Sequence, residues 1–253
     1  MTFPASSAAR QQVLPLDWEP EQTLANFDTG GQGGNAQIVA AVAALLGKSA
    51  HDALYLWGSD GSGKTHLLSA ACRAVQQQGR RALLLGPHTA GSDWPEIGDL
   101  LGRPGGLLAV DDVEALGDWQ QDLLFGLYNA ARSADIAFLA CGDRAPAALP
   151  LRADLRTRLG WGLALRLAPP DDAARERVLQ RLAHGHWYAL SPELLQYMLT
   201  HLSRDLRSLA ELMAAFDRYA LALQRPATVP LLKSLLAQQP ELLRPESAGA
   251  HGD

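Results

Sequence analysis

The strongest constraint on the fold of this 253-residue chain is the segment from Gly58 to Thr65, which reads GSDGSGKT. It fits the pattern G-x-x-x-x-G-K-[ST] and lies between a short apolar run, residues 53–57, and a helical pattern, residues 65–78. In such a loop, glycines let backbone N–H groups turn toward phosphates, and the following helix N-terminus adds positive potential. We therefore expect ADP or ATP here, contacted by Gly58, Ser59, Asp60, Gly61, Ser62, Gly63, Lys64 and Thr65.

Short apolar runs alternate with helical patterns as far as Pro169 and Pro170, which predicts a parallel sheet with crossover helices. The predicted strands are 53–57, 82–85, 107–110, 136–140 and 163–167, with helices at 35–47, 65–78 and 123–131. Only helical patterns follow, at 171–184, 191–201, 204–223 and 228–237. We expect a flexible tail at 1–22, an α/β subdomain at 23–169, a helical lid at 170–238 and a disordered tail at 239–253.

Charge and hydropathy exclude several classes of protein. The net charge of −5 argues against a dedicated DNA-binding domain, which usually has a basic stripe. There is no apolar run of 20 residues and no hydrophobic leader, so we expect a cytoplasmic protein without a membrane partner. The two cysteines, Cys72 and Cys141, lack metal-ligand spacing and are expected to be reduced core thiols.

Acidic residues follow two of the predicted strands. Asp111 and Asp112 end the apolar run 107–110, and the interpretation as a solvated loop start stands beside a catalytic one. In the catalytic interpretation, Thr65 and Asp111 bind Mg²⁺ and Asp112 polarises an attacking water. Asp143 follows the strand 136–140 and would sense the γ-phosphate, or it is a turn residue between Gly142 and Arg144.

Six further segments carry a resemblance to a known family: GSDGSGKTHLL, LLAVDDVEAL, FGLYNAAR, FLACGDRAPAAL, LRADLRTRLGWGLALRLAPPDD and SRDLRSLAELM. They occur in the same order over residues 23–237, and together they resemble the DnaA/Hda clade of AAA+ proteins. The resemblance implies a P-loop NTPase with a five-stranded parallel sheet and a small helical lid. It favours the Hda branch, because the sequence has no segment resembling the helix-turn-helix domain of DnaA.

The Hda resemblance implies a negative regulator of chromosomal replication initiation. Such a protein docks on the DNA-loaded sliding clamp, the β subunit of DNA polymerase III, and stimulates ATP hydrolysis by the initiator DnaA. Residues 11–16, QQVLPL, resemble the clamp-binding hexapeptide of the family, with contacts from Gln11, Leu14, Pro15 and Leu16. Gln12 departs from the usual apolar second position, which implies weaker binding or a shifted register. The other interpretation is a disordered tail with a stray apolar cluster.

Two arginines carry over from the family. Arg158 matches the arginine finger that acts on a neighbour's γ-phosphate, and its alternative is a surface arginine packed on Trp161. Arg204 matches the lid arginine that reaches back to bound nucleotide, and Arg207 is its rival one turn later. For either lid arginine, a salt bridge to Asp205 or Glu211 is the alternative.

Two other functions remain open at this point. An initiator-like or helicase-loader ATPase would also use both acids for hydrolysis, but it should bind single-stranded DNA through a basic aromatic groove, which the sequence does not indicate. A metabolic P-loop kinase should lack a separate C-terminal helical lid. We therefore expect an activator of a partner's ATPase rather than a strong ATPase, with no specific DNA binding; homo-oligomerisation is left open.

Overall fold

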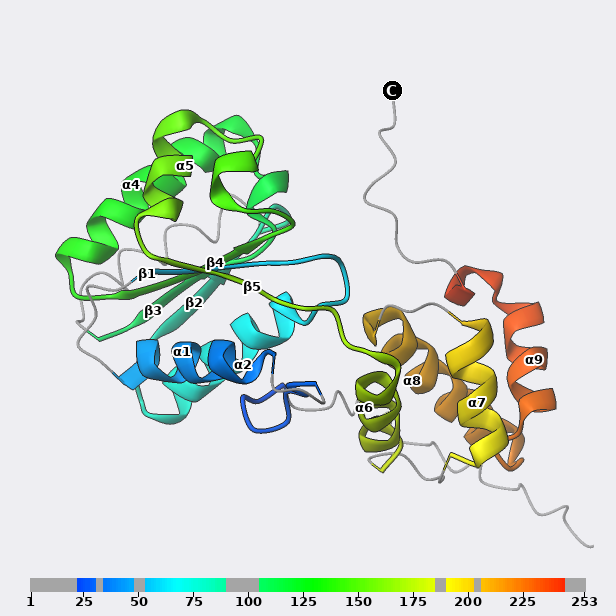
Figure 1. Cartoon of the computed structure of the whole chain (residues 1–253). Helices are drawn as coiled ribbons and strands as arrows, with labels where there is room; N and C mark the ends of the chain where they lie inside the picture. The colour runs from blue at the N-terminus through cyan, green and yellow to red at the C-terminus, as the bar shows by residue number, and fades with distance from the viewer. Residues whose placement is uncertain are drawn as a thin grey trace, which may run out of the picture.

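The α/β part of the chain is built on one five-stranded parallel sheet. The computed structural model describes residues 22–30, 34–47, 53–89, 105–184, 190–202 and 206–243. The strand order is β2-β3-β4-β1-β5, as Figure 1 shows. The strands are β1 (Ala53–Trp57), β2 (Ala82–Leu85), β3 (Leu107–Val110), β4 (Ala137–Gly142) and β5 (Leu163–Arg166). The predicted parallel α/β fold is thus confirmed.

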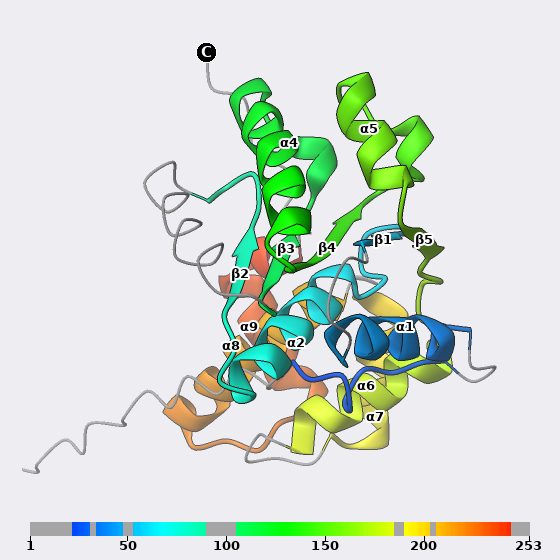
Figure 2. The same cartoon turned by 90° about the vertical axis from the view of Figure 1, so that its left-hand side faces the viewer.

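Helices cover both faces of the sheet. Helices α1 (Ala36–Gly47) and α2 (Lys64–Gln77) lie on one face, and α4 (Asp118–Ser133) and α5 (Ala153–Gly160) lie on the other (Figures 1 and 2). Successive residues of a strand point to opposite faces, so Leu54 and Leu56 pack toward α1 and α2, whereas Tyr55 packs toward α4 and α5. The central strands β3 and β4 are buried along their whole length, which explains why their sequences are continuous apolar runs.

Strand register brings three loops to one edge of the sheet. Trp57 at the end of β1 pairs with Gly142 at the end of β4, and Val110 at the end of β3 pairs with Ala140. The residues that follow these strands are Gly58, Asp143 and Asp111. Because parallel strands present their carboxyl ends at the same edge, the predicted phosphate loop and the predicted acids share this edge.

The C-terminal part is a separate helical unit with its own core. It consists of α6 (Asp172–His184), α7 (Pro192–His201), α8 (Leu206–Leu223), α9 (Val229–Gln238) and the 3-10 turn η4 (Pro240–Leu243). Its core gathers buried side chains such as Met198, Met213 and Phe216. Ser191 caps α7 by accepting a hydrogen bond from the Leu194 N–H at 3.2 Å. This unit lies beside the α/β layers, with α6 nearest to them (Figure 1).

Two helices differ from the prediction. Helix α4 begins at Asp118, whereas the sequence predicted residue 123. The apolar pattern did not reveal its first turns, because the buried side chains there are the amides Gln120 and Gln121. Each donates to a loop carbonyl, Gln120 to Pro87 at 3.1 Å and Gln121 to Leu116 at 2.9 Å. The eight-residue helix α5 was not predicted, since polar side chains surround its only two buried residues, Leu155 and Leu159.

A search of the described ranges for membrane-spanning segments finds no helix with sufficient length and apolar character to cross a bilayer.

Candidate functional site

The loop between β1 and α2 has the backbone geometry of a phosphate cradle. Gly61 and Gly63 have φ angles of +71° and +97°, in the left-handed region that favours glycine. The Lys64 side chain is only 6% exposed and donates to the carbonyl oxygens of Gly58 and Ser59 at 2.9 and 3.2 Å. The Ser62 hydroxyl is buried without a hydrogen-bond partner. A buried cation beside an unsatisfied hydroxyl fits an anionic group such as a phosphate.

The β3 carboxylates lie at the same edge of the sheet. Oxygens of Asp111 and Asp112 and the sulfur of Cys141 lie within 4.8 Å of one another. Burial, and next the charge of Asp111, raises the pKa of the Cys141 thiol, which donates to Asp111 Oδ1 at 2.5 Å. Asp111 also accepts from the Asp112 N–H at 3.0 Å, and Asp112 has a φ of +45°. Carboxylate oxygens are suitable ligands for Mg²⁺, so Asp111 fits the predicted role while the thiol orients it.

Asp143 directly follows β4 and is paired with its neighbour. Arg144 Nε donates to both Asp143 oxygens at 2.8 and 2.9 Å, and this hydrogen bonding is the main reason that the pKa of Asp143 is lowered. The positive charge of Lys64 contributes to the same lowering, so the field of the P-loop lysine reaches this carboxylate. Asp143 is therefore ionised. Its pairing with Arg144 fits the interpretation as a turn residue, while the phosphate-sensing role remains a prediction.

A half-buried acid that the sequence analysis did not select, Glu114, interacts electrostatically with Asp143. Burial raises the pKa of Glu114, and its Oε2 atom has no hydrogen-bond partner. Tyr55, whose pKa is also raised by burial, donates to the Arg144 carbonyl oxygen at 2.8 Å. A methyl group on Gly142 would lie 2.3 Å from the Tyr55 hydroxyl and 2.8 Å from Glu114 Oε2. Only glycine therefore fits at this point of β4, next to both groups.

Residues 22–30, called the strap below, form a wall of the phosphate loop that the sequence analysis also missed. A methyl group on Gly63 would lie 2.6 Å from the Phe27 ring. That ring meets the His66 ring edge-on at 5.4 Å between centroids, and His66 Nε2 lies 3.1 Å from the Thr23 carbonyl oxygen. Burial lowers the pKa of His66, which favours the neutral imidazole. The sequence carries no local signal for these contacts, because they join the strap to a helix more than 30 residues later.

Arg158 lies on α5, and aromatic rings hold its guanidinium. The guanidinium carbon is 4.1 Å from the Trp161 ring centroid and 5.5 Å from that of Phe125 on α4. Trp161 is 56% exposed, so the arginine and the indole form a surface feature. The alternative of packing on Trp161 thus describes the observed conformation, while the finger role remains a prediction.

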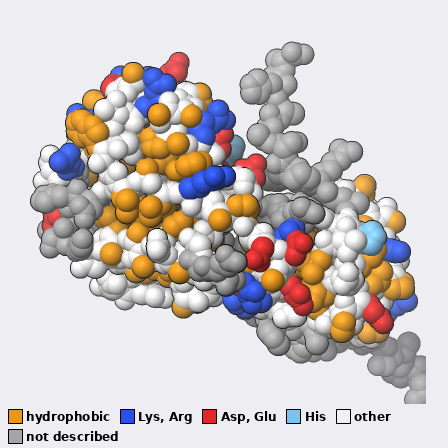
Figure 3. All heavy atoms as spheres, viewed as in Figure 1, with side chains coloured by type: hydrophobic (Ala, Val, Ile, Leu, Met, Phe, Trp, Pro, Cys, Tyr) orange, Lys and Arg blue, Asp and Glu red, His pale blue; other side chains and the backbone are white. Residues whose placement is uncertain are grey.

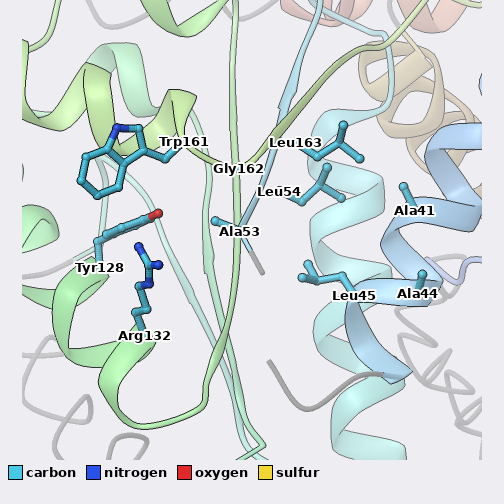
Figure 4. Close-up of a pocket in the computed structure, with 10 residues that line it drawn as sticks. All are labelled: Ala41, Ala44, Leu45, Ala53, Leu54, Tyr128, Arg132, Trp161, Gly162 and Leu163. Atoms are coloured by element: carbon cyan, nitrogen blue, oxygen red, sulfur yellow. The ribbon is translucent and has the colours of Figure 1, made fainter. Parts of the chain in front are cut away.

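The Arg158 region lies at the amino end of the sheet, away from the phosphate loop. A methyl on Gly162 would lie 2.0 Å from the carbonyl oxygen of Ala53, the first residue of β1, whereas Gly58 follows the last. An open cavity of about 490 Å³ lies here, with Tyr128, Arg132 and Trp161 on one side and Ala41, Ala44 and Leu45 on the other (Figure 4). Apolar side chains are prominent on this side of the α/β part (Figure 3). The cavity is therefore separate from the phosphate site.

Several predicted site residues are not placed. Gln11, Leu14, Pro15 and Leu16 lie outside the described residues, as does Arg204.

Known proteins share both parts of this architecture. A family model described as "Hda, lid domain" matches residues 172–236. Domain III of the replication initiation protein DnaA from Thermotoga maritima superimposes with a TM-score of 0.73 at 23% identity, covering 90% of this chain and 99% of that chain. AMPPCP-bound DnaA from Aquifex aeolicus gives 0.61 at 22% identity, covering 77% of this chain and 64% of that chain.

A protein with lower sequence identity also shares the fold. A RuvB variant from Thermotoga maritima gives a TM-score of 0.63 at 15% identity, covering 87% of this chain and 73% of that chain. At these identities the superpositions establish the fold, and the match to the Hda lid model is confined to residues 172–236. The chain thus has the fold of domain III of DnaA, with the parallel sheet and the loop between β1 and α2, and its lid residues 172–236 resemble the Hda lid domain.

Proposed function

We propose that this protein is a nucleotide-bound negative regulator of replication initiation that stimulates ATP hydrolysis by a DnaA-type initiator while docked on the sliding clamp. The observation that carries this proposal is the position of Arg158. It stacks on exposed Trp161 next to Gly162, which abuts the first residue of β1. The phosphate loop begins after the fifth residue of β1, about 16 Å away at about 3.3 Å per residue. Arg158 therefore lies near the end of β1 that is opposite to its own phosphate loop, and this position suits it to another molecule's nucleotide.

The protein's own nucleotide would be ADP or ATP with Mg²⁺. Lys64 and the backbone of residues 58–63 would hold the phosphates, while Thr65 and Asp111 would bind the metal. The buried lysine, the unsatisfied Ser62 hydroxyl and the left-handed glycines support this assignment, as does the AMPPCP-bound state of the Aquifex DnaA structure. Bound Mg²⁺ would neutralise phosphate charge. Asp112 would act as the water-polarising acid, Asp143 as the phosphate sensor and Arg204 as the lid contact.

Arg158 would act by electrostatic stabilisation of the partner's reaction. A guanidinium donates several N–H groups in one plane to phosphate oxygens and neutralises the charge that develops there. The aromatic rings that hold it do not neutralise its charge as a carboxylate would. Residues 11–16 would bring the arginine to the initiator by binding the clamp, and the chain itself would bind DNA weakly, given its net charge of −5.

The experiment is single-turnover hydrolysis of ATP preloaded on the initiator, with DNA-loaded clamp present. Arg158→Ala should remove the stimulation, because a finger supplied in trans contributes about 10³–10⁵-fold in rate. Arg158→Lys should restore little of it, since an ammonium lacks the planar fork. Arg156→Ala, two residues away on α5, is the matched control and should keep most of the activity.

Full stimulation by Arg158→Ala would reject the finger role. Loss of the variant's own ADP affinity would instead indicate a role in cis. Clamp binding and thermal unfolding of each variant distinguish these outcomes from a folding defect.

A second candidate is an initiator-like or helicase-loader ATPase. The observation that favours it is the pair Asp111 and Asp112. The two acids directly follow β3, and a site that hydrolyses ATP would use both. Such a protein should hydrolyse ATP without a partner and bind single-stranded DNA at physiological salt. Basal turnover and a single-strand binding titration separate the two functions.

A further inference from the structure

We propose that Asp28 is a positioning residue that joins the strap to lid helix α6 and thereby keeps the lid closed on the bound nucleotide. The proposal deepens the nucleotide-binding part of the proposed function and rests on it. It concerns residues outside the phosphate loop, on an acid that the motif analysis did not single out. The evidence is two sets of contacts that the strap makes.

The first set of contacts fixes the strap to the phosphate loop and to α2. The Phe27 ring packs so closely on Gly63 that a methyl group there would lie 2.6 Å from it. His66, one turn into α2, meets the same ring and lies within hydrogen-bond distance of the Thr23 carbonyl. Thr23 and Asn26 exchange side-chain hydrogen bonds with each other's backbone N–H at 2.9 and 3.2 Å. The strap therefore forms a defined turn at Thr23–Asn26, and the Phe27 ring that follows it packs on the phosphate loop.

The second set of contacts fixes the strap to the lid. Arg177 on α6 donates to both oxygens of Asp28, from Nε at 2.9 Å and from Nη2 at 2.8 Å. Arg181, one turn later, has its Nη2 3.8 Å from Asp28 Oδ2 and donates from Nη1 to the Asn26 carbonyl oxygen. The Asp28 side chain is 8% exposed, and its Oδ1 also accepts from the Gly30 N–H at 3.0 Å. Removing these donors would leave a buried, unpaired carboxylate, which is energetically costly.

The two sets of contacts connect the lid to the phosphate loop through a single short segment. Phe27 and Asp28 are adjacent in sequence, so the residue on Gly63 and the residue on α6 move together. A nucleotide held by the loop lies beside this segment, and the lid can swing away only if the Asp28 contacts break or the Phe27 ring leaves Gly63. We infer that the Asp28–Arg177 ion pair, together with the phosphate contacts, sets the rate at which nucleotide dissociates.

The test combines release kinetics with hydrogen exchange. The variants are Asp28→Asn, Arg177→Gln, the double variant and Arg177→Lys, with Glu176→Gln as the control on the same helix. Glu176 accepts from Gln180 within α6, and no contact joins it to the strap in the described part of the chain. One measurement is dissociation of a fluorescent ADP analogue from the full-length protein. The second is amide exchange of α6 in the nucleotide-free protein, which reports on the lid contact without any ligand.

Asp28→Asn and Arg177→Gln should each speed release about five- to tenfold, which is the loss expected for a charge-assisted pair whose arginine is half-exposed. The double variant should release no faster than the single ones, because each single change already breaks the pair. Arg177→Lys should be intermediate, and Glu176→Gln should match the wild type. Exchange of α6 should rise in the same order.

Wild-type release from both single variants, or effects that add in the double variant, would overturn the proposal. If the wild-type protein binds no ADP, the nucleotide-binding proposal fails. Unchanged α6 exchange in Asp28→Asn rejects the lid contact independently of that result.

Discussion

Gly63 offers a direct test of how closely the strap is packed on the phosphate loop. Gly63→Ala adds a methyl group at a residue whose φ is +97° and places it 2.6 Å from the Phe27 ring. The backbone conformation alone costs an alanine about 1–2 kcal/mol. Overpacking in a filled site costs about 1–3 kcal/mol more, with the lower value if the ring swings aside. We therefore expect a destabilisation of about 2–5 kcal/mol, or about 5–15 °C in Tm.

Gly126→Ala is the matched control for this change. Gly126 lies within α4, and the same methyl group there meets nothing within 4 Å. Alanine at an exposed helical position should stabilise the protein by up to about 1 kcal/mol. Thermal unfolding followed by circular dichroism measures both variants, and calorimetric titration with ADP measures binding. If Gly63→Ala melts at or above the wild-type temperature, the close packing of Phe27 on the loop is refuted.

Three further predictions test other parts of the site. Lys64→Ala should weaken ADP and ATP binding by about 1.5–3 kcal/mol, the contribution of a charge-assisted hydrogen bond, and unchanged affinity by calorimetry would contradict the phosphate role. Replacing Leu14 and Leu16 together by Ala should abolish clamp binding while the melting temperature stays the same; a peptide of residues 8–20 that does not bind the clamp at high concentration would reject the motif. Asp28 has a pKa lowered chiefly by Arg177, so its stabilisation is present above its unfolded pKa of 3.8 and is lost as pH falls through the lower folded value. The stability difference between wild type and Asp28→Asn in urea should therefore be larger at pH 7 than at pH 3, and a constant difference would count against the ion pair.

Local pattern was sufficient for the sheet and for the phosphate loop. Strand β1, the glycine loop and α2 are consecutive in sequence, and each is specified by the apolar period or the glycine spacing of its own segment. The same is true of β3, whose four residues are all buried and are followed directly by Asp111. These elements were predicted with nearly their observed bounds because the information that specifies them is contiguous.

Contacts between distant segments account for what the sequence did not reveal. Asp28 and Arg177 are separated by 149 positions, and neither stands out from its neighbours. Arg158 shows the opposite case, in which the residue was selected but its environment was ambiguous. The structure records the stacking on Trp161 that one interpretation required, and the finger role remains a prediction. Helix α5 was missed because two buried leucines define too short an apolar stripe.

The junction between sheet and lid has a mechanical consequence. The Asn35 side chain donates to the Ala168 carbonyl oxygen and accepts from the Ala168 N–H, both at 3.0 Å, and the Leu167 N–H donates to the Trp57 carbonyl oxygen at 2.7 Å. The chain is thus clamped to the sheet up to Ala168, and α6 begins at Asp172. Any rotation of the lid must be absorbed by the three residues between them, two of which are prolines with φ fixed near −65°. Few torsions are therefore available for a lid rotation, and its axis would lie close to Leu167, whose carbonyl oxygen lies against Gly58 of the phosphate loop.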